Sequence, residues 1–354
     1  MKIHKNRVLI VGSGNIFEKH LSVLKYLNKK FEIAGIIEKN PKKLKVLKKK
    51  FSNKVFCNLN YALNNIDFDL GCILTDSGSH AKLALKFLNR KKSVIIEKPI
   101  SISLKDAEKI VNLEKKNKKC KIFVVKQNRF NIAITKLKKA LMKKKLGKLF
   151  LASASVKWMR DKNYYSSASW RGTWKSDGGV LCNQAIHHID LLQWLAGDIE
   201  SVFCESLRVS APIETEDTAV AVLKFNNGAT GTIEATTASR PSNLEGSITL
   251  MGTKGTVIIG GFSANKIIHW KLINSKKSDK RLFENSENPK NFFAYPHMKF
   301  YEYVYEVIKN KKSNFLNARE AIKSLKIVTA LVKSSKTGKK VYLNENLYNT
   351  SLGK

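Results

Sequence analysis

The sequence lacks the features by which membrane-spanning, secreted and zinc-binding proteins are recognised. No apolar run approaches the ~20 residues that a transmembrane helix needs. The N-terminal segment has neither the long apolar core nor the cleavage site of a signal peptide. The five cysteines are odd in number and widely spaced, without a CxxC pair, which argues against a disulfide framework and a zinc site. We therefore expect a cytoplasmic protein with no membrane partner and no metal.

Acidic residues are also scarce, since 28 Asp and Glu face 65 Lys and Arg, for a formal net charge of +37. The lysines are spread along segments such as 42–50, 115–121 and 136–145. No finger, helix-turn-helix or aromatic RNA-binding signature accompanies them. We interpret the charge as a compositional bias that attracts anionic small molecules, and we expect no nucleic-acid partner.

At 354 residues, 43% of them hydrophobic, the chain is long enough for two domains, each with its own core. Up to residue 125, strand-like runs alternate with helical patterns, which predicts an α/β domain with a doubly wound parallel sheet. From 126 to 354 the pattern predicts an α+β domain with a large open, mostly antiparallel sheet, frayed only over about its last ten residues. The expected strands are 7–11, 32–37, 55–57, 69–74, 94–96 and 122–125, then 150–158, 200–209, 218–225, 229–237, 247–251 and 256–259.

A glycine turn follows the first expected strand and precedes a helix, the setting in which a pyrophosphate-binding loop belongs. Gly12 permits the tight turn, and Gly14 lets the backbone approach a pyrophosphate at the helix N-terminus. Asn15 and Ile16, at the same helix start, are therefore expected to contact the cofactor. Phe17 replaces the third small residue of the usual fingerprint, which predicts looser packing between helix and strand.

The second expected strand ends in an acid, Glu38, at the spacing that suits a hydrogen bond to the adenosine ribose hydroxyls. This residue favours NAD over NADP. Lys39 and Lys43 weaken the preference, because either could pair with a 2′-phosphate.

The tripeptide Glu97-Lys98-Pro99 ends the buried strand 94–96. Proline cannot donate to a sheet ladder and keeps the preceding residue out of helical geometry, so Lys98 leaves the carboxyl end of the strand. Ligands bind at such ends in open α/β sheets, although a solvated lysine is the alternative in so lysine-rich a chain. Small polar residues after the preceding strand are expected beside the nicotinamide ribose: Thr75, Ser77 and, next to the cofactor only, His80.

A helix is expected from residue 178 to about 196, where it follows two glycines. On it Asn183 and His187 are four residues apart and Asp190 is three further, so the three lie near one face. A histidine beside a carboxylate is a candidate general base. The alternative is that His187 and its neighbour His188 are structural.

Taken in order along the chain, these motifs resemble those of the Gfo/Idh/MocA oxidoreductases: Gly12-x-Gly14, Glu97-Lys98-Pro99, and Gly178-Gly179 followed by Asn183, His187 and Asp190. The resemblance covers nearly the whole chain. It implies an NAD-binding Rossmann domain, 1–125, and a second domain, 126–354, whose open sheet builds a homo-oligomer, either a dimer or a tetramer. It also implies that Lys98 and His187 flank the substrate carbon, with Glu97 and Gln127 among the cofactor contacts.

Four further segments, 126–131, 170–174, 183–188 and 243–248, resemble the branch that oxidises the 3-hydroxyl of UDP-N-acetylglucosamine uronate for surface polysaccharides. Asn183 stands where inositol dehydrogenase relatives often carry aspartate, which places more of the proton chemistry on His187 and Lys98. The resemblance implies an anionic nucleotide-sugar substrate, with arginines as bidentate partners of its acidic groups. The expected substrate contacts are Lys98, Arg129, Arg160, Trp170, Arg171, Asn183, His187 and Arg240.

Two other functions stay open at this point. The same fold could oxidise a free sugar or an inositol, and a protein of another class, a non-catalytic nucleotide-binding regulator, could keep the dinucleotide site alone. The presence of both Lys98 and His187 argues against a silent protein. Which of the two takes the proton is also open.

Overall fold

The computed structural model describes residues 5–210, 212–273, 287–289 and 294–354. The chain divides into two compact units. The first holds residues 1–101, 105–125 and 292–322, and the second holds 102–104, 126–291 and 323–354. Helix α10 (Tyr295–Ile308) and the start of α11 (Ala318–Thr337) thus belong with the first unit, a return of the chain that a simple division after residue 125 does not include.

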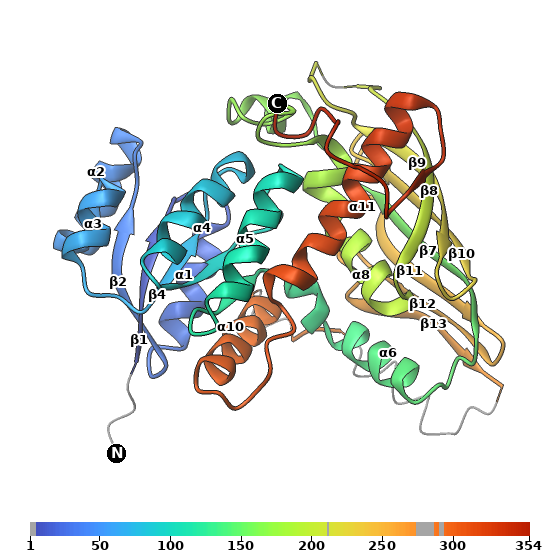
Figure 1. The fold of residues 1–354 in the computed structure, drawn as a ribbon, viewed down its shortest axis with the longest axis horizontal. Helices are drawn as coiled ribbons and strands as arrows, with labels where there is room; N and C mark the ends of the chain where they lie inside the picture. Colours follow the sequence, from blue (N-terminus) through green and yellow to red (C-terminus); the bar gives the residue numbers. More distant parts are fainter. Residues whose placement is uncertain (1–4, 211, 274–286, 290–293) are drawn as a thin grey trace. The chain divides into compact units, whose positions relative to one another are not determined.

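A six-stranded parallel sheet forms the first unit (Figure 1). Consecutive residues in its central strands are fully buried, as in Val8–Ile10 and Val94–Ile96, so both faces of the sheet are covered. This is the doubly wound topology that the alternation of strands and helices predicts. The strands β1 (Asn6–Val11), β2 (Phe31–Ile37), β3 (Val55–Phe56), β4 (Leu70–Ile73), β5 (Ser93–Ile96) and β6 (Ile122–Val124) pair in the order β3-β2-β1-β4-β5-β6.

Local sequence signals set the helices of this unit. Asn40 caps α2, where its side-chain oxygen accepts the N–H groups of Lys42 and Lys43 at 3.0 and 3.1 Å, and Pro41 fills the first helical position. Gly71 lets α4 approach β4, because a Cβ there would lie 2.6 Å from the Phe87 ring. Besides α10 and the start of α11, the described helices of this unit are α1 (Phe17–Tyr26), α2 (Pro41–Phe51), α3 (Leu59–Asn65), α4 (His80–Asn89) and α5 (Leu104–Lys116).

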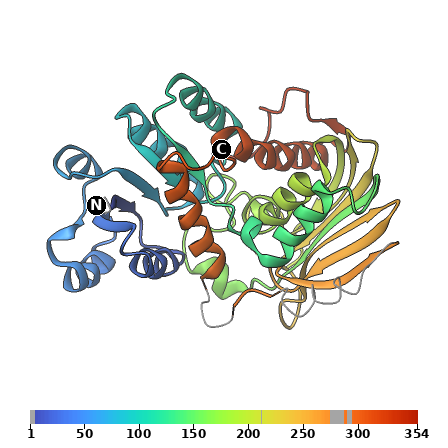
Figure 2. The ribbon, with the colours of Figure 1, turned by 90° about the horizontal axis from the view of Figure 1, so that it is seen from below.

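An eight-stranded sheet forms the second unit, and all its pairs are antiparallel except that between β7 and β10. Helix α8 (Ile186–Ala196) packs on β7 and β11, and α6 (Ile132–Met142) packs on β12 and β13, both on one face of the sheet (Figure 2). The strands β7 (Leu149–Lys157), β8 (Ile199–Leu207), β9 (Thr218–Phe225), β10 (Thr230–Thr236), β11 (Glu245–Gly252), β12 (Gly255–Gly260), β13 (Lys266–Leu272) and β14 (Val341–Tyr342) follow the order β13-β12-β11-β7-β10-β9-β8-β14.

The structure differs from the sequence-based expectation in three places. The helix predicted over 178–196 is split, because a π-helical turn, Val180–Gln184, precedes α8. Strands β13 and β14 are additional to the predicted set. The C-terminal end is packed rather than frayed, since Leu347 and Leu352 are buried and a Cβ on Gly178 would lie 2.9 Å from the side chain of Leu352. Among the described residues, no helix is both long enough and apolar enough to cross a membrane.

Candidate active site

The glycine turn after β1 has the geometry that a dinucleotide requires. Gly12 has a φ of +96°, and a Cβ there would lie 2.9 Å from the Thr75 methyl group, so only glycine fits. No side chain caps the N-terminus of α1 at Ile16. The Phe17 N–H donates to the Gly14 carbonyl at 2.9 Å, so the glycine turn leads directly into the helix start, where a pyrophosphate is expected. Asn15 is exposed in the turn. Phe17, the departure from the fingerprint, is buried at the start of α1.

Glu38, at the end of β2, is held in a fixed position. Its Oε2 accepts hydrogen bonds from the Ser13 N–H, at 3.1 Å, and from the Ser13 hydroxyl, and its Oε1 accepts the Asn40 N–H at 2.7 Å. Burial alone would raise the pKa of Glu38, but these hydrogen bonds lower it, so the carboxylate stays charged. An oriented carboxylate beside the glycine turn suits the ribose hydroxyls of NAD. Lys43 stands beside the same turn, with its Nζ 3.4 Å from the Ser13 carbonyl.

Lys98 is half-buried and follows β5 directly. Its backbone N–H donates to Glu97 Oε2 at 3.1 Å, and the other carboxylate oxygen of Glu97 lies 2.9 Å from His20 Nε2. The Lys98–Pro99 peptide bond is cis. The lysine therefore stands at the carboxyl edge of the sheet, as predicted, on a backbone that a buried carboxylate holds.

The residues after β4 lie at the same edge. Thr75 is half-buried and Ser77 is buried, and the Ser79 hydroxyl donates to Thr75 Oγ1 at 2.6 Å. His80 is buried at the start of α4, where Nδ1 lies 2.7 Å from the Pro99 carbonyl and Nε2 lies 3.2 Å from the Thr75 carbonyl. The imidazole joins the loops after β4 and β5.

In the second unit, the π-helical turn positions Asn183. Its side-chain amide donates to the buried Asp177, so a carboxylate lies beside this asparagine. Glu216 holds the turn itself, because its carbonyl accepts the Val180 N–H and its carboxyl Oε1 accepts the Leu181 N–H, both at 3.1 Å. Neither acid was identified from the sequence, since neither lies in a motif.

The two adjacent histidines of α8 differ in their surroundings. His188 is fully buried, and burial lowers its pKa to about 4, so it is a neutral core residue. His187 is only half-buried. The difference in burial thus distinguishes the candidate base, His187, from the core residue His188. The sequence alone does not distinguish them.

Asp190, predicted on the face of His187, instead holds two cations in the interior. Arg129 binds it with Nε and Nη2, both at 2.7 Å, and Lys126 donates to it and, at 3.1 Å, to the Ser324 hydroxyl. Burial raises the pKa of Asp190, but the two cations lower it to about 2. Contact of Arg129 with substrate stays a prediction. Gln127, in the same segment, has a buried side-chain oxygen with no hydrogen-bond partner among the described residues.

Two of the predicted substrate residues, Arg160 and Arg171, lie on one tyrosine ring, and a third, Trp170, lies against Arg171. The guanidinium of Arg171 lies 4.0 Å from the Tyr164 ring centroid and 4.7 Å from that of Trp170, and the guanidinium of Arg160 lies 5.1 Å from the Tyr164 ring centroid. We call Arg160, Tyr164, Trp170 and Arg171 the arginine–aromatic cluster. It adjoins an open hollow of about 430 Å³ lined by Met159, Arg160, Asp161, Tyr164, Pro241, Ser242 and Asn243.

Arg240 comes directly before Pro241, Ser242 and Asn243 in the sequence, three residues that line this hollow. Its guanidinium donates to the Ser239 carbonyl at 2.8 Å and to the Ser210 hydroxyl at 3.3 Å. Lys157, another cation of this unit, is paired with Glu234 and Glu245 at 2.9 and 3.1 Å.

A doubly wound sheet with a fixed glycine turn, followed by a separate open-faced sheet, is typical of a two-domain dinucleotide-binding protein. Residues 6–125 match the NAD-binding Rossmann fold of an oxidoreductase family, and residues 138–343 match its C-terminal alpha/beta domain. These matches span most of the chain, so the protein belongs to the Gfo/Idh/MocA family of oxidoreductases and binds NAD. The predicted family and fold class are confirmed.

The chain is similar to two WlbA dehydrogenases that were crystallised with NADH and UDP-GlcNAcA. The enzyme of Chromobacterium violaceum is 32% identical to this chain, and the structural match covers 97% of each chain with a TM-score of 0.91. The enzyme of Bordetella pertussis is also 32% identical, and its match covers 97% of this chain and 100% of that enzyme's chain with a TM-score of 0.90. Myo-inositol 2-dehydrogenase of Thermotoga maritima is 25% identical over 234 residues, 64% of this chain and 67% of that protein.

The ionisation of Glu216 predicts a pH-dependent stability. Burial raises its pKa to about 8 from 4.5, with Asp177 and Asp217 adding to the effect and the Leu181 N–H opposing it. The folded state therefore binds the proton more tightly, and stability falls as the pH rises from about 4.5 to 8, by at most roughly 5 kcal/mol. Glu216→Gln keeps the acceptor for Leu181 and cannot ionise, so we expect its unfolding free energy to exceed that of the parent increasingly between pH 5 and 9.

Chemical denaturation across this pH range measures the effect. Glu214→Gln is the control, because Glu214 is an exposed carboxyl two residues away. Parallel curves for the parent and Glu216→Gln would mean that Glu216 ionises as it does in the unfolded chain.

Proposed function

We propose that the protein oxidises the 3-hydroxyl of a UDP-N-acetylglucosamine uronate, with NAD as the hydride acceptor. The observation that carries this proposal is the 32% identity over 97% of the chain with enzymes crystallised with NADH and UDP-GlcNAcA. Likeness over this length includes both the cofactor unit and the unit that holds Asn183 and His187. A role in surface-polysaccharide synthesis belongs to the same proposal.

Oxidation of a secondary alcohol requires a group that takes the hydroxyl proton while the hydride leaves. NAD, when bound, supplies the hydride acceptor. We assign removal of the hydroxyl proton to Lys98 and His187. Lys98 follows β5 at the edge of the first unit's sheet, and His187 lies on α8 of the second unit. A neutral imidazole suits a base near pH 7. Asn183, backed by Asp177, is assigned to orient the sugar.

The arginine–aromatic cluster is the proposed site for the acidic part of the substrate. A UDP-sugar acid carries a diphosphate and a carboxylate, and guanidinium groups bind both in bidentate geometry. Arg160 and Arg171 lie on one tyrosine ring beside the hollow, and the ring keeps the guanidinium planes in place. Lys98 and Arg240 are the further proposed cations of the substrate site, with Arg129 retained as a prediction.

The first test is turnover. We expect UDP-N-acetylglucosamine uronate, and not myo-inositol, to reduce NAD, and we expect Lys98→Met and His187→Ala each to lower kcat at least about 100-fold, the usual contribution of an acid–base group. NAD affinity should stay within about twofold. Lys82→Met, on the exposed face of α4, is the control for loss of a lysine.

Turnover of inositol alone would identify the alternative, a dehydrogenase of free polyols, to which the likeness with myo-inositol 2-dehydrogenase would then point. NAD binding without turnover of any alcohol would support a non-catalytic regulator. Full activity in both variants would refute the assigned roles. The pH profile of the residual activity in each variant separates Lys98 from His187 as the proton acceptor.

The second test concerns the arginine–aromatic cluster. Each charge-assisted contact with a phosphate contributes about 1.5–3 kcal/mol, so Arg160→Ala and Arg171→Ala should raise KM for the nucleotide sugar roughly 10- to 100-fold, with kcat changed much less. Binding of UDP alone, measured by calorimetry, should weaken in parallel, and binding of NAD should not. Lys175→Ala removes an exposed cation from the same loop and should leave KM unchanged. Unaltered UDP affinity in both arginine variants would place the diphosphate elsewhere.

We also propose that the protein assembles through the open face of its large sheet. Val222 on β9 is 55% exposed and lies directly opposite Phe203 on β8, which is 39% exposed, and Val220 adds a third exposed apolar side chain. An uncovered apolar sheet face favours contact with a second copy. Val222→Glu should shift the protein toward monomers in sedimentation velocity, whereas Val46→Glu, at a valine of α2 that is 66% exposed, should not. Identical sedimentation of the two variants would contradict the assignment.

A further inference from the structure

A buried histidine lies on each side of Lys98, the residue to which the proposed function gives proton chemistry. On the N-terminal side, His20 Nε2 lies 2.9 Å from Glu97 Oε1, and Glu97 Oε2 accepts the Lys98 N–H at 3.1 Å. On the C-terminal side, His80 Nδ1 lies 2.7 Å from the Pro99 carbonyl. His20 and His80 are 0% and 1% exposed. The backbone of Lys98 is thus held from both directions by groups that do not meet solvent.

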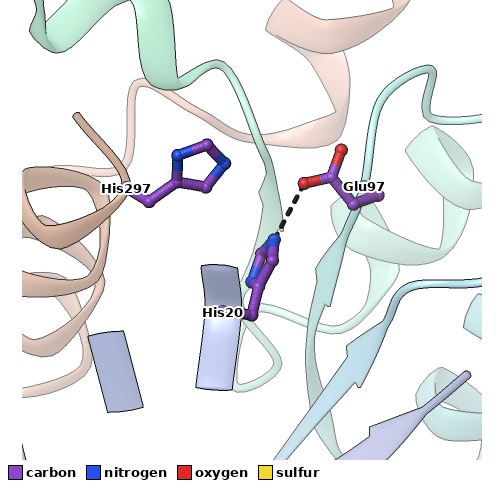
Figure 3. Close-up of side chains that lie close together, drawn as sticks. All are labelled: His20, Glu97 and His297. Atoms are coloured by element: carbon purple, nitrogen blue, oxygen red, sulfur yellow. Dashed lines mark hydrogen bonds and ion pairs between the residues drawn. The ribbon is translucent and has the colours of Figure 1, made fainter. Parts of the chain in front are cut away.

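His20 is itself held on its far side. Its Nδ1 lies 2.8 Å from the Tyr301 hydroxyl, which contacts Cys72 Sγ at 3.4 Å. The His297 ring packs edge-on against the His20 ring, with centroids 5.3 Å apart, and Figure 3 shows these two histidines with Glu97. Cys72 Sγ, Glu97, His297 and Tyr301 are the titratable groups that face His20 from β4, from the end of β5 and from α10. Both ring nitrogens are therefore engaged, one in a chain toward Lys98 and the other in a chain toward α10.

The pair of His20 and Glu97 is ionic. Burial lowers the pKa of His20, but the contacts with Cys72 and Glu97 raise it to about 9. Burial raises the pKa of Glu97, but the hydrogen bond and charge of His20 lower it to about 2. Burial and the charge of His20 keep His297 neutral, with a pKa of about 3. A buried ion pair with satisfied hydrogen bonds is strongly oriented, because neither partner can rotate away without losing its compensation.

His20 links its ion pair with Glu97 to the dinucleotide-binding helix. It lies on α1, one turn after Ile16, and the N-terminus of α1 faces the glycine turn. A single hydrogen-bonded path therefore runs from the dinucleotide-binding helix through His20 and Glu97 to the N–H of Lys98. The path fixes the lysine relative to the helix that meets the cofactor.

A metal ion is the competing interpretation of this cluster. Ligand atoms of His20, Glu97 and His297 lie within 4.8 Å of one another. The geometry favours the hydrogen-bonded pair, because both nitrogens of His20 already have partners at 2.8 and 2.9 Å and a ligating nitrogen must carry no proton.

We propose that His20 and His80 are positioning residues for the oxidation, which act by fixing the backbone of Lys98 through Glu97 on one side and through the Pro99 carbonyl on the other. The proposal rests on the proposed function in assigning proton chemistry to Lys98. Displacement of a reacting group by about 1 Å costs roughly 100-fold in rate, so loss of either contact should appear in kcat.

The two histidines use different ring nitrogens for the contact that leads to Lys98, Nε2 in His20 and Nδ1 in His80, which allows a crossed test. A glutamine amide reaches the place of Nε2 and an asparagine amide reaches the place of Nδ1. His20→Gln should therefore keep kcat within about fivefold of the parent, whereas His20→Asn should lower it roughly 30- to 100-fold. At His80 the order reverses, with Asn retaining activity and Gln losing it. KM for NAD and the melting temperature should vary little within each pair.

A second readout does not depend on the substrate. Acetic anhydride acetylates the Lys98 amine, and peptide mass spectrometry measures the extent of the modification. That extent should differ from the parent in His20→Asn and His80→Gln, and should match the parent in His20→Gln and His80→Asn. Lys82 provides the internal reference. If the parent oxidises no alcohol, the proposed function fails while this labelling still decides the positioning role.

Three results would overturn the proposal. Equal losses for Asn and Gln at both positions would show a purely structural role. Unchanged kcat and unchanged Lys98 labelling in His20→Asn and His80→Gln would show that the lysine is fixed by other contacts. One equivalent of zinc per chain in the purified parent, lost in His20→Asn, would establish the metal site instead. If His20→Asn does not fold, the comparison of the two His80 variants decides between these outcomes by itself.

Discussion

Parallel pairing of strands is the constraint on which the cofactor site depends. In a parallel sheet every strand ends at the same edge, so segments that are remote in sequence become neighbours there. The glycine turn follows β1, Glu38 follows β2, Thr75 follows β4 and Lys98 follows β5, and these strands are adjacent in the order β2-β1-β4-β5. No single one of these residues would specify a dinucleotide site. Their convergence at one edge does, because each supplies a different part of the cofactor's surroundings.

The scarce acids have an importance that the net charge of +37 conceals. Buried carboxylates fix candidate functional groups within each unit. In the first unit Glu97 holds the N–H of Lys98, and in the second Asp190 binds Arg129 and Lys126 and Glu216 holds the π-helical turn. A buried carboxylate is costly without partners, so each one orients the groups around it. The excess of lysine lies mainly on exposed helix faces such as that of α2, and the few acids inside determine where backbone and cations are fixed.

Prediction from the sequence succeeded where local periodicity and tertiary burial agree. The run Val94-Ile95-Ile96 could only be a strand buried on both faces, and it lies next to the centre of the sheet. Prediction failed where a distant contact decides the conformation. The π-helical turn depends on Glu216, 32 residues further along the chain than Gln184, and Leu352 holds the C-terminal end against Gly178. His20 was overlooked because one histidine on an amphipathic helix carries no local signal of its partners.

The sequence by itself determined the fold class, the family and the position of Lys98 at a strand end, because strand periodicity, glycine at a tight turn and proline after a strand act over a few residues. Only the tertiary structure decided what each polar side chain faces. Arg129 turned out to hold Asp190, His188 to lie in the core, and Arg160 and Arg171 to meet on Tyr164. The physical reason is that hydrogen bonds and ion pairs act over about 3 Å, and chain folding alone sets which groups come that close.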